Sequence, residues 1–158
     1  MSNGKKTVEV VAGNIPDHHN RLIALARQAL TYEASMAVGA AQEAVKRAQE
    51  SWARELKPFV DKHADGARSI GPDHPNHAAF VEDAREVFER TVEIEIVPIP
   101  ERLIHESARI MQERANAGVG QPLLLSYADL RILKEVGIIE GEGEGDPEEE
   151  DAESDDED

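Results

Sequence analysis

Hydrophobic and polar residues alternate most regularly in the stretch TVEIEIV, residues 91–97. Its valine and isoleucines are separated by glutamates, a pattern typical of a β-strand with one buried face and one face in water. The stretch TVEVVA, residues 7–12, is short and rich in β-branched residues, and it predicts a second strand. A short edge strand is expected at residues 138–139, where two isoleucines follow Gly137.

The segment from about residue 17 to residue 57 predicts one long helix. Pro16 suits the first turn of such a helix, and the helix is expected to end just before Pro58. Gly39 is expected to bend or split it. At a rise of roughly 1.5 Å per residue, an unbroken helix would reach about 60 Å, which is more than a compact domain of this size needs.

The second half of this segment has a narrow apolar face. At 100° per residue, seven apolar residues fall within one arc of roughly 80°. They are Val38, Ala41, Val45, Ala48, Trp52, Leu56 and Phe59. Because a long helix with such a seam often pairs with a copy of itself, we expect a homo-oligomer.

The remaining chain alternates between loop and helix. Two Gly and two Pro residues predict a loop over 64–77. Further helices are expected over about residues 78–90, 101–116 and 127–137. The predicted fold class is therefore α+β, mostly helical, with one long N-terminal helix and two short β-strands in a single folded domain, residues 1–139.

Two strand-to-helix passages resemble one another at an offset of 84 residues. Thr7–Glu9 matches Thr91–Glu93, and the Ile-Pro-Asp of 15–17 matches the Ile-Pro-Glu of 99–101. One interpretation is an internal duplication of a β-loop-α unit, with its two strands side by side. The other is coincidence, because these residue types suit strands and helix starts in general.

The charge of the chain is concentrated at its end. The sequence has 33 acidic and 17 basic residues, a net charge of −16, but 13 of the acids lie in residues 140–158, EGEGEGDPEEEDAESDDED. The rest of the chain is nearly neutral. A segment of this composition cannot bury enough apolar surface to offset chain entropy, so we expect a disordered acidic tail.

Three uses of the tail are open. It can imitate a nucleic-acid backbone and compete for a binding groove, because a tethered segment has an effective concentration of about millimolar. It can recruit basic partners, or simply keep the protein soluble. The carboxylates expected to act in this way are Glu148, Glu149, Glu150, Asp151, Asp155, Asp156, Glu157 and Asp158.

Six basic residues are candidates for contact with a phosphate backbone. They are Lys46, Arg47, Arg54, Lys57, Lys62 and Arg68. However, Glu43 precedes Arg47 by four residues, and Glu50 precedes Arg54 by four. Such spacing also describes an exposed helix face that neutralises its own charge, so both interpretations stay open.

No pattern in the chain predicts catalysis. There are no cysteines, and the serines lack the spacing of a nucleophile with its base. Histidines 63, 74 and 77 lie close in sequence to aspartates, a donor set that zinc, manganese or nickel accepts. No HExxH or EF-hand pattern accompanies them, so we expect an ordinary loop, with no metal, no cofactor and no enzyme activity.

The layout of a near-neutral body followed by Glu140–Asp158 resembles bacterial and phage single-stranded-DNA-binding proteins. This resemblance implies a single-stranded-DNA-binding accessory protein, with a polymerase or another basic protein as a further partner. The two predicted strands contain no aromatic residue for base stacking, so any binding would use a helical fold. Tyr32, Trp52 and Tyr127 are then the candidate stacking residues.

The leading hypothesis is a non-enzymatic protein that binds single-stranded DNA in phage replication or transcription, with a tail that competes for the binding groove. The alternative is an oligomeric assembly or adaptor protein that binds no nucleic acid, whose tail governs solubility or docks basic partners. No stretch reaches membrane-spanning length or fits a secretion signal, so we expect a cytoplasmic location, that of the host if a phage encodes the chain.

Overall fold

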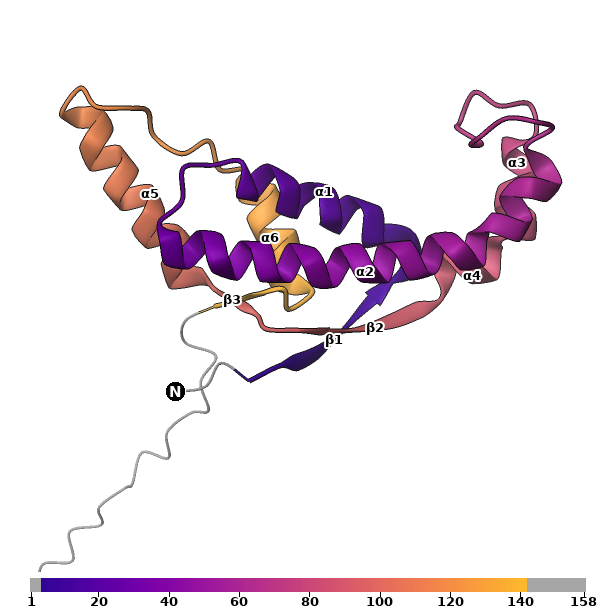
Figure 1. Cartoon of the computed structure of the whole chain (residues 1–158), viewed down its shortest axis with the longest axis horizontal. Helices are drawn as coiled ribbons and strands as arrows, with labels where there is room; N and C mark the ends of the chain where they lie inside the picture. The colour runs from indigo at the N-terminus through magenta and orange to yellow at the C-terminus, as the bar shows by residue number, and fades with distance from the viewer. Residues whose placement is uncertain (1–3, 142–158) are drawn as a thin grey trace, which may run out of the picture.

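The computed structural model describes residues 4–141. The first half contains the strand β1 (Lys6–Val11), the 3-10 turn η1 (Ala12–Asn14) and the helices α1 (Ile15–Ala26) and α2 (Tyr32–His63). The second half contains α3 (His77–Asp83), α4 (Arg85–Glu89), β2 (Thr91–Ile96), β3 (Ile99–Pro100), α5 (Glu101–Asn116), α6 (Tyr127–Glu135) and β4 (Ile139–Glu140). Figure 1 shows α2 running across the molecule, between α1 and the ribbon of β1 and β2.

The strands form two small sheets. β1 and β2 pair antiparallel, with Val8 opposite Ile94 and Glu9 opposite Glu93. Val8, Val10, Ile94 and Ile96 are buried and Val92 is partly buried against the same core, which confirms the alternating pattern. β3 pairs in parallel with β4 through Ile99 and Ile139, so the expected edge strand is also present.

The predicted long N-terminal helix is wrong in this detail, because two helices, α1 and α2, occupy the segment. Thr31 starts the second helix: its side-chain oxygen accepts a hydrogen bond from the Ala34 N–H at 3.3 Å. The Thr31 N–H donates in turn to the buried Ser107 hydroxyl of α5 at 3.0 Å. A contact between segments that are distant in the sequence therefore stabilises the break.

Pro58 does not end α2, and Gly39 does not interrupt it; the helix continues to His63. Pro58 cannot donate a hydrogen bond to the carbonyl of Arg54. Both residues are exposed, so water can reach that carbonyl and the loss is small. The next predicted helix, 78–90, is instead divided into α3 and α4 at Ala84, whose φ and ψ are −91° and 8°.

The core lies between α2 and the elements around it. Along the predicted seam of α2, the residues Val38, Ala41, Val45 and Trp52 are buried within the chain itself, with Leu22 of α1 in the same cluster. This face therefore no longer argues for self-association. The homo-oligomer stays a prediction, and light scattering on the purified protein tests it.

The pH dependence of stability is expected to depend on His18. This residue is 4% exposed, and its Nδ1 has no hydrogen-bond partner in the described part of the chain. Burial, and next the positive charge of Arg21, lower the pKa of His18 below 6.5, while Asp17 opposes them. The unfolded chain therefore binds a proton more readily than the folded protein does. As the pH is lowered from about 7 to 5, the free energy of unfolding decreases.

Denaturant unfolding at several pH values measures this effect. His18→Gln should flatten the dependence in that window, because the buried imidazole is removed. If the free energy of unfolding depended on pH as strongly in His18→Gln as in the parent protein, another group would be responsible for the effect.

Candidate functional site

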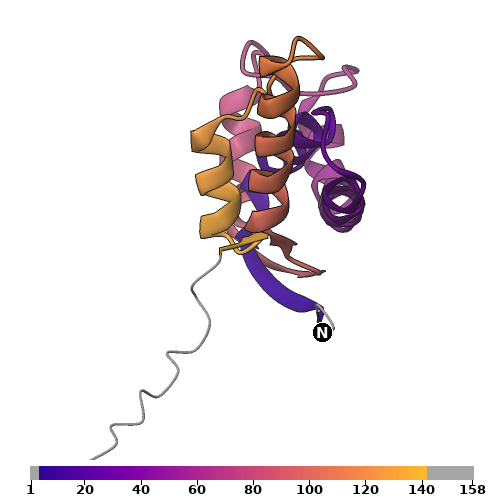
Figure 2. The same cartoon turned by 90° about the vertical axis from the view of Figure 1, so that its left-hand side faces the viewer.

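The ribbons of α5 and α6 are neighbours in the view of Figure 2, and side chains of both helices line a groove between them. It forms a half-open cavity of about 410 Å³. Its floor is apolar and consists of Ile104, Leu130 and Ile139. We call this the α5–α6 groove: those three residues with Tyr127, Arg131 and Lys134 on α6 and Glu101 and His105 on α5.

Local sequence features position α6 beside α5. The Ser126 hydroxyl accepts a hydrogen bond from the Asp129 N–H at 3.3 Å, which caps the start of α6 as the sequence predicts. Leu133 is buried and anchors the helix on the core. After α6, Gly137 has a φ of +88°, and this turn brings Ile139 back to pair with Ile99 at the base of the groove.

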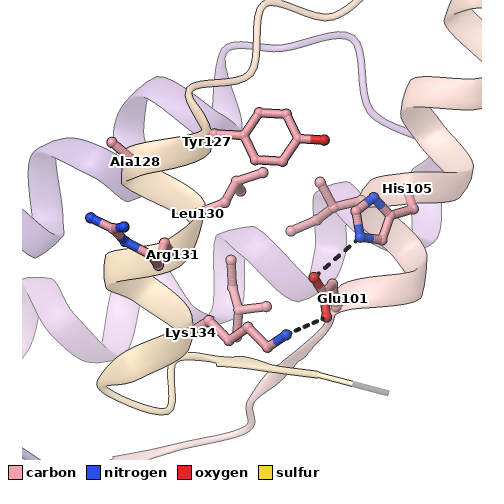
Figure 3. A pocket seen from close by; sticks show the side chains of 9 residues that line it. Glu101, His105, Tyr127, Ala128, Leu130, Arg131 and Lys134 are labelled. Carbon is pink, nitrogen blue, oxygen red and sulfur yellow. Dashed lines mark hydrogen bonds and ion pairs between the residues drawn. The ribbon is translucent and has the colours of Figure 1, made fainter. Parts of the chain in front are cut away.

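Charged groups close one end of the groove (Figure 3). The Lys134 Nζ lies 3.2 Å from the Glu101 carboxylate, and the His105 Nε2 also lies 3.2 Å from it. The hydrogen bond from Lys134, and to a lesser degree that with His105, lowers the pKa of Glu101 although partial burial opposes them. This carboxylate therefore links α5 to α6.

The rest of the groove is open. The Arg131 Nε lies 3.7 Å from Glu135, and both side chains are largely exposed, so this pair is weak. Tyr127 exposes 88% of its surface. An exposed aromatic ring beside an apolar cavity forms a surface suited to binding another apolar group. No residue of the groove is placed as a nucleophile with a general base.

The six predicted phosphate-binding residues all lie outside the groove. Lys46, Arg47, Arg54 and Lys57 lie on the exposed face of α2, Lys62 lies near its end, and Arg68 lies in the loop beyond. Lys57 pairs with Asp61 at 2.7 Å, and Lys62 pairs with Asp83 at 2.8 Å. Within residues 4–141, Lys46, Arg54 and Arg68 have no ion-pair partner within 4.0 Å.

The structure gives the candidate histidines other partners. His63 Nε2 lies 2.9 Å from the Asp83 carboxylate. His74 Nδ1 accepts a hydrogen bond from the Asn76 N–H at 3.0 Å, and its Nε2 lies 3.2 Å from the carbonyl of Ala64. Lys62, and next His63, lower the pKa of Asp83 by hydrogen bonding to it. Over the described range 4–141, no three His, Asp or Glu side chains are grouped so as to hold a metal ion.

Sequence reasoning identified Tyr127 as a candidate for base stacking but missed the groove beside it. The floor comes from three separate segments, and no local pattern links Ile104 to Leu130 or Ile139. The tail carboxylates Glu148, Glu149, Glu150, Asp151, Asp155, Asp156, Glu157 and Asp158 lie outside the described residues. Glu140, assigned to the tail, belongs to β4 and pairs with Lys6.

No protein family, curated protein or solved structure matches this chain. In the part that the structure describes, no helix is long and apolar enough to cross a membrane.

Proposed function

We propose that this chain is a non-enzymatic adaptor protein that binds an amphipathic helix of a partner protein in the α5–α6 groove. The observation that carries the proposal is the cavity of about 410 Å³ between two helices, with an apolar floor and an exposed tyrosine at its open end. A third helix could fill this space with its own apolar side chains, as helices do when they bind in the groove between two others.

The groove favours a particular partner chemistry. Tyr127 and Lys134 are seven residues apart on α6, which is about two helical turns or roughly 10 Å. A bound helix would therefore contact the floor with apolar residues at about three successive positions, i, i+3 or i+4, and i+7. The α6 wall contributes Arg131 and Lys134, so acidic residues beside those apolar positions would add to the affinity.

Selection from a display library of peptides about four turns long tests the proposal. The full chain should select peptides that combine this apolar spacing with acidic residues. Tyr127→Ala should weaken their binding roughly tenfold, or about 1.4 kcal/mol, because a central aromatic anchor is lost. Calorimetry on the selected peptide measures the change.

The matched control uses the only other tyrosine. Tyr32 is 82% exposed and lies at the start of α2, so Tyr32→Ala should leave the affinity unchanged. The proposal fails if no peptide is selected, or if the two variants bind the selected peptide equally well. A second copy of the chain as occupant would instead appear as self-association that Tyr127→Ala abolishes.

A second candidate function is single-stranded-DNA binding in phage replication or transcription. Lys46 and Arg54 favour it, because both are exposed on α2 without an ion-pair partner among residues 4–141. Glu43 and Glu50 lie on the same exposed face, and this mixture of charges weakens the case. Titration of a labelled oligonucleotide with the full chain decides: salt-sensitive binding lost in Lys46→Gln/Arg54→Gln supports it, and no binding at physiological salt removes it.

A further inference from the structure

We infer that residues 142–158 bind the cationic wall of the α5–α6 groove in the same molecule, as an acidic occupant that competes with the partner helix. Only the competition rests on the proposed function. The contact itself is inferred from where the chain leaves the described fold, from the charge on each side and from the weakness of the ion pair between Arg131 and Glu135.

The acidic segment begins at the groove. Ile139 of β4 contributes to the groove floor, and β4 lies at the lower end of α5 and α6 in Figure 2. Gly141 lies against the closed end, since a Cβ built on it would be 2.8 Å from Lys134 Nζ and 3.1 Å from the Glu101 carboxylate. Gly141, the last residue before the segment, therefore lies beside Lys134 of the α6 wall.

The charges are complementary. Residues 142–158 contain 12 acidic residues and no basic one. The α6 wall presents Arg131 and Lys134, whose present partners are Glu135 at 3.7 Å and Glu101 at 3.2 Å. The Arg131 and Glu135 side chains are 74% and 68% exposed, and pairs of this kind contribute about 0–1 kcal/mol, so a tail carboxylate can replace Glu135 at little cost.

Covalent attachment raises the local concentration of the acidic segment at the groove, which offsets the weakness of each ion pair. A tethered segment has an effective concentration of about millimolar, which is enough to occupy a weak site and yield to a stronger ligand. The reach is ample, because 17 residues can extend to roughly 60 Å and Tyr127 lies only about 10 Å along α6 from Lys134. The occupied groove would thus open only to a partner that binds more tightly than the tail.

A spin label on the full chain tests the contact. Because the sequence has no cysteine, Ser154→Cys gives a single site for a nitroxide label. Amide signals of residues 127–134 and 101–105 should lose intensity when the label is oxidised. The loss should disappear in about 0.5 M NaCl, where the Debye length is roughly 4 Å.

Matched double substitutions locate the charges responsible. Arg131→Gln/Lys134→Gln should abolish the loss of intensity, whereas Lys46→Gln/Arg54→Gln should preserve it. The inference is overturned if the affected signals lie on α2 around residues 46–54, if no signal beyond 134–141 is affected, or if salt has no effect. These readouts need no partner, so they stand or fall separately from the peptide selection.

Discussion

Replacing Trp52 with alanine is expected to lower the free energy of unfolding by about 3–5 kcal/mol. Trp52 is 9% exposed, and its Nε1 donates a hydrogen bond to the carbonyl of Val87 at 3.2 Å. Its ring packs edge-to-face on Phe88 at a centroid distance of 5.5 Å, and Phe88 packs in the same way on Phe80 at 5.7 Å. The substitution removes a side chain that joins α2 to α4.

Circular dichroism during denaturant unfolding measures this loss, since the variant contains no tryptophan for fluorescence. Trp52→Phe retains an aromatic ring and should lose less stability than Trp52→Ala. Tyr32→Ala is the surface control and should change stability by less than about 0.5 kcal/mol. A loss below about 1 kcal/mol in Trp52→Ala would contradict the packing described for this cluster.

Replacing Gly137 with valine is expected to destabilise the protein by about 1–3 kcal/mol. Gly137 has a φ of +88°, which a β-branched residue rarely adopts, and a Cβ there would lie 3.2 Å from Val8 Cγ1. The same turn directs Ile139 into the groove floor. The variant should therefore also lose affinity for the peptide that the groove selects.

A second glycine provides a control of opposite sign. Gly39 lies in the middle of α2, and a Cβ there would have no atom within 4 Å. Gly39→Ala should therefore stabilise the protein by about 0.5–1 kcal/mol, because alanine loses less backbone entropy in a helix. A Gly137→Val variant as stable as the parent protein would contradict the role given to this turn, and a destabilised Gly39→Ala variant would contradict the open surroundings of Gly39.

The sequence predicted the strands well because their pattern is local. The alternation in residues 91–97 specifies which side chains of β2 are buried, and the short β-branched stretch from Thr7 predicts β1. The helix over 101–116 and the Ser126 cap of α6 likewise depend on neighbouring residues. Each of these features is determined by residues a few positions away in the sequence, so the local sequence is sufficient to predict it.

The sequence was insufficient where the structure depends on contacts between segments that are far apart in the chain. The end of α1 and the start of α2 depend on the hydrogen bond from Thr31 to Ser107, 76 residues away. The apolar seam of α2 packs on α1 and the β1–β2 sheet of the same chain, so it no longer supports the homo-oligomer, which stays a prediction. The α5–α6 groove was not predicted, because its floor assembles from Ile104, Leu130 and Ile139.

The two similar strand-to-helix passages contain β1 and β2, and these strands pair with one another. Glu9 and Glu93 are equivalent under the 84-residue offset, and they lie opposite one another. Val8 opposes Ile94, and Val10 opposes Val92, so exchanging equivalent positions reproduces the same pairing. A local two-fold axis of this kind is what a duplicated β-loop-α unit would give, and duplication stays a hypothesis.

The site of peptide binding tests the proposed adaptor function most directly. Amide chemical shifts of the full chain, followed during titration with a selected acidic amphipathic peptide, identify the residues that it contacts. The shifts should concentrate at residues 101–105, 127–134 and 139, and Tyr127→Ala should suppress them. Shifts confined to the exposed face of α2 around Lys46 and Arg54, with the groove signals unchanged, would contradict the proposed function.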